Sequence, residues 1–284
     1  PVPGYASDPA IPLSLLATMR GDYATAVTLA EQAVRANSPE SHIANLYNAY
    51  YVLTSATLAQ GDYARAQQYA HQAYTLTRRA NDRWFTAYVL IEMGKIALAQ
   101  DDLATAQKHF QASYQLRQEI EDPEGMAIAL VYSGQVLLRK QAYAEAQSSF
   151  EQSLGIYQEI DDKGGLARTY QGLGQIACAQ GKYETARYAL HQALLLAAEM
   201  NFVPLFFSIL SAMASLFMAV EQWESSYALF SFVSQQPKAD HATRTEAEKQ
   251  LRHFAPFAEA DNHTLAVPSP GLTLADVFYL MEPF

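Results

Sequence analysis

The pattern of apolar and small residues in this chain repeats every 40 residues. Each repeat holds a six-residue block with an aromatic residue or leucine in third place and a small residue at its end. The blocks begin at Gly21, Gly61, Asp101, Gln141, Gly181 and Glu221. Twelve residues before the end of each block lies another small residue, namely Ser14, Thr54, Gly94, Gly134, Gly174 and Ala214. Self-similarity at one fixed period indicates a stack of similar units, so we expect six repeats.

Two antiparallel helices joined by a tight turn at the block explain the spacing within each repeat. The residue four places beyond the block falls on the same face of the second helix; these residues are Ala30, Ala70, Phe110, Phe150, Leu190 and Phe230. Glycine inside a helix costs roughly 1 kcal/mol relative to alanine, so its recurrence at one position of the first helix indicates that two helices pack closely there. Helix pairs are predicted at 9–20/23–36, 42–60/63–80, 82–100/103–120, 123–140/143–160, 163–180/183–200 and 202–220/223–235.

Asx residues between the repeats are predicted to start the next helix, because their side chains accept hydrogen bonds from free backbone N–H groups. They are Asn81 with Asp82, Asp122, Asp162 and Asn201. Pro123 suits the first position of a helix. No segment indicates a strand, so the sequence predicts an all-α protein.

The repeats divide the chain into three regions. Residues 1–40 form the first repeat, which has a partly irregular start, and residues 41–240 form repeats 2–6. Residues 241–284 hold a capping helix near 244–257, a Pro-rich loop and a short amphipathic helix at 272–281. The terminal unit of a stack needs a polar outer face, which the capping helix provides.

This arrangement resembles the tetratricopeptide repeat (TPR), a helical-hairpin family with a small residue in the first helix and a Gly-x-Tyr turn. The resemblance covers residues 9–236 and implies a right-handed α-solenoid of about six antiparallel helix-turn-helix repeats. The unit is six residues longer than the common 34-residue repeat. The long form is similar to the sensor modules of bacterial STAND-type and LuxR-like regulators, which couple a nucleotide-hydrolysing switch to such repeats.

Composition and charge exclude several classes of protein. Half of the residues are hydrophobic, so the chain is not disordered. The 19 Lys and Arg against 29 Asp and Glu give a net charge of −10, which disfavours nucleic acid and anionic membranes as partners. The single cysteine excludes an internal disulfide. No uninterrupted apolar run is long enough to cross a bilayer, so we expect a cytoplasmic protein.

The candidate chemical motifs do not converge on an active site. Residues 172–177 match Gly-x-Gly-x-x-Ala, which binds dinucleotides only between a strand and a helix, whereas here it lies within a predicted helix. The seven histidines show no metal-binding spacing. Cys178 has no base that the sequence can name as its partner. We therefore expect no enzyme, no catalytic residue, no metal and no cofactor.

The resemblance to TPR proteins implies that first helices line a concave, ligand-binding groove. Counting from the recurrent small residues gives the candidate binding residues Asn48, Tyr51, Ser55, Tyr88, Lys95, Gln135, Arg139, Arg168, Gln171 and Gln175. The cations among them favour an acidic or extended peptide, held by amides and by Arg. The alternative is that nearby Glu92 or Glu124 neutralises them.

Two functions follow from this reading. In the first, the chain is a non-enzymatic module that binds a protein or peptide segment, or a small inducer, as the ligand-sensing or partner-recruiting part of a larger cytoplasmic signalling or transcription regulator. In the second, it is a scaffold or oligomerisation module that uses its convex face or its C-terminal tail. A tail that folds back into the groove, through the apolar side chains of residues 272–280, is a further hypothesis. The sequence does not determine the oligomeric state.

Overall fold

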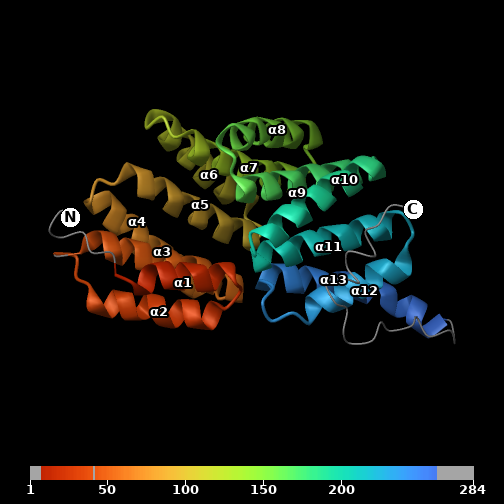
Figure 1. Cartoon of the computed structure of the whole chain (residues 1–284), viewed down its shortest axis with the longest axis horizontal. Helices are drawn as coiled ribbons and strands as arrows, with labels where there is room; N and C mark the ends of the chain where they lie inside the picture. Colours follow the sequence, from red (N-terminus) through yellow and green to blue (C-terminus); the bar gives the residue numbers. More distant parts are fainter. Residues whose placement is uncertain (1–7, 41, 261–284) are drawn as a thin grey trace. The chain divides into compact units, whose positions relative to one another are not determined.

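A computed structural model describes residues 8–40 and 42–260, which form thirteen helices and contain no strand (Figure 1). The all-α prediction is confirmed. The predicted loop and amphipathic helix of the tail, at 268–281, lie outside the described residues. The chain divides into two compact units, unit 1 at residues 1–165 and unit 2 at residues 166–284.

Unit 1 is a row of helical hairpins in chain order (Figure 1). Its helices are α1 (Ala10–Met19), α2 (Tyr23–Ala36), α3 (Ile43–Gln60), α4 (Tyr63–Arg79), α5 (Arg83–Ala99), α6 (Leu103–Glu119), α7 (Pro123–Arg139) and α8 (Tyr143–Ile160). Its buried residues form several small, alanine-rich clusters between neighbouring helices. Odd-numbered helices are the first helix of each hairpin and even-numbered helices are the second.

Unit 2 continues the same pattern with larger side chains. Helix α9 (Lys163–Ala179) begins at the end of unit 1, and α10 (Tyr183–Glu199), α11 (Val203–Ala219), α12 (Trp223–Ser234) and α13 (His241–Ala260) follow. One continuous core runs through unit 2 and includes Phe207, Phe217 and Phe230. The predicted capping helix is confirmed as α13, whose Phe254 contacts Tyr227 of α12 at a ring-centroid distance of 5.6 Å.

Nearly every helix ends in the same left-handed corner, so that the 40-residue repeat consists of two 20-residue halves. Positive φ angles occur at Gly21, Gly61, Asn81, Asp101, Glu121, Gln141, Asp161, Gly181, Asn201 and Glu221. The N–H group of the following residue donates to a carbonyl five residues earlier, as from Asp22 to Ala17 at 2.9 Å and from Asp62 to Thr57 at 3.0 Å. This is the Schellman motif, which satisfies the last carbonyl groups of a helix.

The predicted helix starts are correct at Asp82, Asp122 and Asp162 and wrong at Asn81 and Asn201. The carboxylates of Asp82 and Asp122 accept the N–H groups of Phe85 and Gly125 at 2.9 and 3.0 Å. The carboxylate of Asp162 accepts the N–H group of Gly164 at 2.9 Å. Asn81 and Asn201 instead have φ angles of 53° and 52° and lie where α4 and α10 end. Asn suits both positions, because its short side chain tolerates the left-handed conformation and also caps helices.

The recurrent small residues mark the closest contacts within a hairpin, as predicted. A Cβ atom on Gly94 would lie 2.3 Å from Phe110, and one on Gly174 would lie 2.7 Å from Leu190. Where the first helix carries Thr54, the second carries Ala70, which is also buried. Both residues of this contact are therefore small in that hairpin, whereas only the first-helix residue is small where glycine faces Phe110 or Leu190.

Candidate functional site

The residues predicted to bind a ligand lie on the first helices. In unit 1, Asn48, Tyr51 and Ser55 lie on α3, Tyr88 and Lys95 on α5, and Gln135 and Arg139 on α7. Arg139 is exposed and the other six are half-buried. We call the surface formed by these three helices the first-helix face of unit 1.

An aromatic patch, formed by Tyr51, Trp84, Phe85 and Tyr88, occupies part of this face. Trp84 and Tyr88 are one helical turn apart on α5, and their ring centroids are 4.7 Å apart. Tyr51 reaches the patch from α3, with ring-centroid distances of 5.4 Å to Phe85 and 6.3 Å to Tyr88. Trp84 keeps 50% of its surface exposed. A large aromatic surface that remains in solvent beside half-buried rings is a feature of interaction sites.

A buried arginine lies beneath the patch. The guanidinium carbon of Arg117, on α6, is 3.9 Å from the centroid of the Tyr88 ring and 5.3 Å from that of Trp84. Its Nη1 atom donates to Asp122, whereas Nε and Nη2 have no hydrogen-bond partner among the described residues. Gly125 makes room for this side chain, because a Cβ atom there would lie 2.4 Å from Cδ of Arg117. Arg117 thus holds the two rings in place from below.

Lys95 is neutralised by Glu92, which lies three residues earlier on α5. The Nζ atom of Lys95 is 2.8 and 3.0 Å from the two carboxylate oxygens of Glu92. The side chain of Glu92 is only 4% exposed. Lys95 also lies 5.8 Å from the ring centroid of Tyr132, on α7. The alternative in which Glu92 neutralises the predicted cation is therefore the arrangement observed.

Lys95, Tyr51 and Tyr88 all have raised pKa values on this face. Burial by itself lowers the pKa of Lys95, but the charge of Glu92, together with Tyr132 and Tyr51, outweighs it and raises that pKa. Burial, followed by the charge of Glu92, raises the pKa of Tyr51. Burial also raises the pKa of Tyr88, although the charge of Arg117 opposes it. None of these groups is suited to proton transfer near neutral pH.

Other predicted residues of unit 1 already have partners. Arg139 lies 3.3 Å from Asp101 in an ion pair that is exposed on both sides. Such pairs contribute little to stability and open readily. The side-chain amide of Asn48 donates to the carbonyl of Ala44 on its own helix, at 2.8 Å. The structure therefore brings Tyr51, Tyr88 and Lys95 together.

The three predicted residues of unit 2 lie on α9. The amide of Gln171 donates to the hydroxyl of Ser208 on α11 at 2.8 Å, and at 7% exposure it connects these helices rather than facing solvent. The guanidinium carbon of Arg168 lies 4.7 Å from the ring centroid of Phe202. Among the residues that the structure describes, no carboxylate lies within ion-pair distance of Arg168. Gln175 is half-buried.

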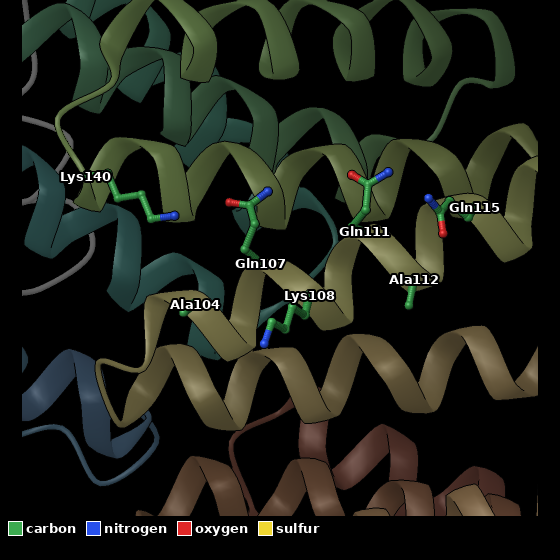
Figure 2. Close-up of a pocket in the computed structure, with 7 residues that line it drawn as sticks. All are labelled: Ala104, Gln107, Lys108, Gln111, Ala112, Gln115 and Lys140. Atoms are coloured by element: carbon green, nitrogen blue, oxygen red, sulfur yellow. The ribbon is translucent and has the colours of Figure 1, made fainter.

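A shallow hollow of about 430 Å³ lies on the second-helix side of unit 1, over α6. Figure 2 shows Gln107 and Gln111 projecting to the same side of α6 as Lys140, which follows α7. The remaining lining residues are Ala104, Lys108, Ala112 and Gln115. This hollow was not predicted from the sequence, and it lacks the aromatic residues of the first-helix face.

The candidates for catalysis or metal binding gain no support from the geometry. Burial raises the pKa of the Cys178 thiol, which disfavours the reactive thiolate. Gly174 of the Gly-x-Gly-x-x-Ala motif lies within α9, packed against Leu190. Within the described part of the chain, no group of three or more His, Cys, Asp or Glu residues could hold a metal ion. No described helix is both long and apolar enough to cross a membrane.

Sequence reasoning missed Trp84, Phe85 and Arg117. Trp84 could have been found, because it lies four residues before Tyr88 and so shares its helical face. Arg117 carried no such signal. The corresponding positions of repeats 2, 4 and 5 hold Thr77, Tyr157 and Ala197, which are ordinary core residues.

The fold is shared with several solved structures. A Rap protein complexed with competence and sporulation factor superposes with a TM-score of 0.63 at 14% identity, over 88% of this chain and 75% of that one. A STAND protein with a tetratricopeptide repeat sensor, from Pyrococcus horikoshii, gives a TM-score of 0.55 at 15% identity, over 88% of this chain and 42% of that one. Aspartyl phosphate phosphatase F from Bacillus subtilis gives 0.58 at 16% identity, over 86% and 69%. At these identities the likeness shows the fold alone.

Stacked helical hairpins with a recurrent small residue in each first helix define this molecule as a TPR-type helical repeat protein. The profile of the MalT-like TPR region matches residues 10–261. The chain therefore belongs to the MalT-like TPR family, which confirms the resemblance seen in its repeats. No curated protein matches the sequence.

Proposed function

We propose that this chain is a non-enzymatic recognition module that binds a protein or peptide segment on the first-helix face of unit 1. In this proposal it is the ligand-sensing or partner-recruiting part of a larger cytoplasmic signalling or transcription regulator. The observation that carries the proposal is the aromatic patch, with Trp84 half-exposed above a fixed set of rings. Rigid aromatic side chains of this kind dominate the binding energy of peptide and protein interfaces.

The charges around the patch favour an apolar or aromatic anchor over an acidic one. Lys95 is paired with Glu92, and Arg117 with Asp122. An acidic ligand would have to compete with these carboxylates. A side chain that stacks on Trp84 would instead bury apolar surface without disturbing either pair. In unit 2, Arg168 stays a candidate for a carboxylate of the ligand, with Gln175 two helical turns later on α9.

Two named neighbours support binding as the shared role of this fold. The Rap structure contains a bound competence and sporulation factor, and the archaeal STAND protein is described as carrying a TPR sensor. Both statements concern those proteins. For this chain they support a proposal of ligand sensing, with a small inducer as the alternative ligand.

Random-sequence peptides displayed on phage and selected on the immobilised full chain provide the test. Selected peptides, synthesised with a fluorescent label, are titrated by anisotropy against wild type, Trp84→Ala, Tyr88→Ala and Trp223→Ala. Trp223 is the matched control, because it is 44% exposed but lies on a second helix of unit 2. We expect Kd to rise at least about tenfold for the first two variants and to stay unchanged for the control. Failure to select any peptide, or equal affinity of all four proteins, would contradict the proposal.

The scaffold function also has an observation in its favour. Tyr188 and Leu195, seven residues apart on the second helix α10, are 63% and 42% exposed. Residues at this spacing share one helical face, and exposed apolar faces attract partners. If Tyr188→Ser lowers the molar mass of the chain measured by light scattering, while Trp84→Ala does not, the second helices drive assembly.

A further inference from the structure

Helix α1 has the composition of an interior helix although it lies at the start of the described hairpins. No charged residue occurs between Ala10 and Met19. Ile11, Ser14 and Ala17 are buried in contacts with α2 and α3. A helix that is apolar on all sides is normally covered on all sides. Here Leu13 and Leu16 are 54% and 41% exposed, and we call these two side chains the outer face of α1.

The 40-residue repeat shows what covers this position in the other hairpins of unit 1. Leu16 corresponds to Ala56, Ile96 and Val136, which are no more than 3% exposed. Leu13 corresponds to Leu53, which is 1% exposed, and to Met93 and Ser133, which are half-buried. These residues lose their exposure because the second helix of the preceding hairpin packs on them.

The second helices that cover these positions, α2, α4 and α6, present the same pattern of small and apolar residues. Ala56 clusters with Ala26 of α2, and Ile96 clusters with Ala66 and Ala70 of α4. Val136 clusters with Ala106 and Phe110 of α6. Each partner offers an alanine and, one helical turn later, a second apolar residue. The small residue lets the two helices approach, and the apolar residue one turn later covers the side chain from the first helix.

We propose that the outer face of α1 is a stacking surface for the second helix of a further TPR-type hairpin, presenting Ala-x-x-x-Ala or Ala-x-x-x-Phe. The interface would repeat those of α2 on α3, α4 on α5 and α6 on α7. A second copy of the chain is a poorer occupant. Its second helices would have to contact α1 through Ala26, Ala66 or Ala106, and these residues are already fully buried. Leu15 is not part of this face, because it corresponds to Ser55 and Lys95 on the first-helix face.

Accessibility of a cysteine at position 16 tests the proposal in the full chain. Leu16→Cys is made with Cys178→Ser, so that a maleimide probe reports one site, and the rate of labelling is measured together with the molar mass by light scattering. We expect a monomer that labels rapidly. Slow labelling of a monomer would mean that another part of the same chain covers the outer face of α1. A dimer that dissociates in the Leu16→Glu variant would mean that a second copy of the chain covers it. Either result overturns the proposal.

A grafted hairpin tests the partner. Residues 41–82 are duplicated ahead of residue 3, which preserves the 40-residue spacing and creates an Asp-Pro junction like Asp122-Pro123. Labelling at position 16 is expected to slow at least about tenfold, as for groups that react only through local opening. In the matched control, glutamate replaces the grafted copies of Ala66 and Ala70 only, and rapid labelling is expected to return. A folded graft, verified by its added helical circular dichroism, that leaves the rate unchanged would overturn the proposal.

Discussion

The contact between Gly94 and Phe110 offers the sharpest test of how the hairpins are held together. Gly94→Ala adds one methyl group on α5, directed at a ring carbon of Phe110 on α6 at 2.3 Å. Phe110 has no exposed surface and stacks on Tyr132, with ring centroids 5.4 Å apart. The Phe110 ring therefore has no free space in which it could move away from the added methyl group.

Two effects of opposite sign determine the size of the change. Replacing a mid-helix glycine by alanine stabilises a helix by about 1 kcal/mol. Overpacking a well-filled core costs about 1–3 kcal/mol, and the confined ring places this case in the upper half of that range. We expect the free energy of unfolding to fall by about 1–2 kcal/mol, measured by urea denaturation with circular dichroism.

Gly155→Ala is the matched control. Gly155 lies inside α8, and nothing lies within 4 Å of the Cβ atom it would gain. The same chemical change should therefore raise the free energy of unfolding by about 1 kcal/mol. The two substitutions must change the free energy of unfolding in opposite directions if packing, and not helix propensity, determines the effect of Gly94→Ala.

A second substitution isolates the contact itself. Phe110→Leu reproduces the pairing of Gly174 with Leu190 and makes room for the new methyl group. The double variant should be more stable than the sum of the single changes by at least about 0.5 kcal/mol. If Gly94→Ala is as stable as wild type, or if Phe110→Leu brings no relief, the small–large explanation of the repeat is wrong.

Two further predictions concern the buried charges. Arg117→Met should leave the free energy of unfolding unchanged or raise it, since apolar replacements of buried ion pairs commonly do so. Asp122→Ala should lower it by about 3 kcal/mol, because the buried guanidinium loses its carboxylate. Thermal unfolding distinguishes the two variants, and equal losses of stability would contradict this reasoning. Raised pKa values of Tyr51 and Lys95 mean that the folded state keeps protons that the unfolded state begins to lose near pH 10. Stability should therefore fall as pH rises above about 10, and the fall should be smaller in Tyr51→Phe; identical pH profiles would refute the assignment.

Much of the fold could be predicted because helix formation and hairpin closure leave local, periodic traces. The recurrence of Gly94, Gly134 and Gly174 indicated the close contacts, and the helix bounds followed within a few residues. Asn201 was misassigned because one residue type suits both the end of one helix and the start of the next.

The candidate site was only partly predictable. Tyr51 and Tyr88 were found because a helical face is periodic in sequence. The charge of the site stayed open between free cations and neutralisation by Glu92 or Glu124, because it depends on side-chain direction and on contacts between helices. Lys95 turns toward Glu92 on its own helix, while Arg117 enters from α6 to lie beneath rings of α5.

The sequence by itself determined the number of hairpins and the identity of their closest contacts, since each depends on a period of 3.6 or 40 residues. Only the tertiary structure decided which cations are neutralised, which aromatic ring stays in solvent and which leucines of α1 stay exposed. These properties belong to pairs of residues from different helices, and the free energy of burying a charge or an apolar surface depends on what the second helix supplies.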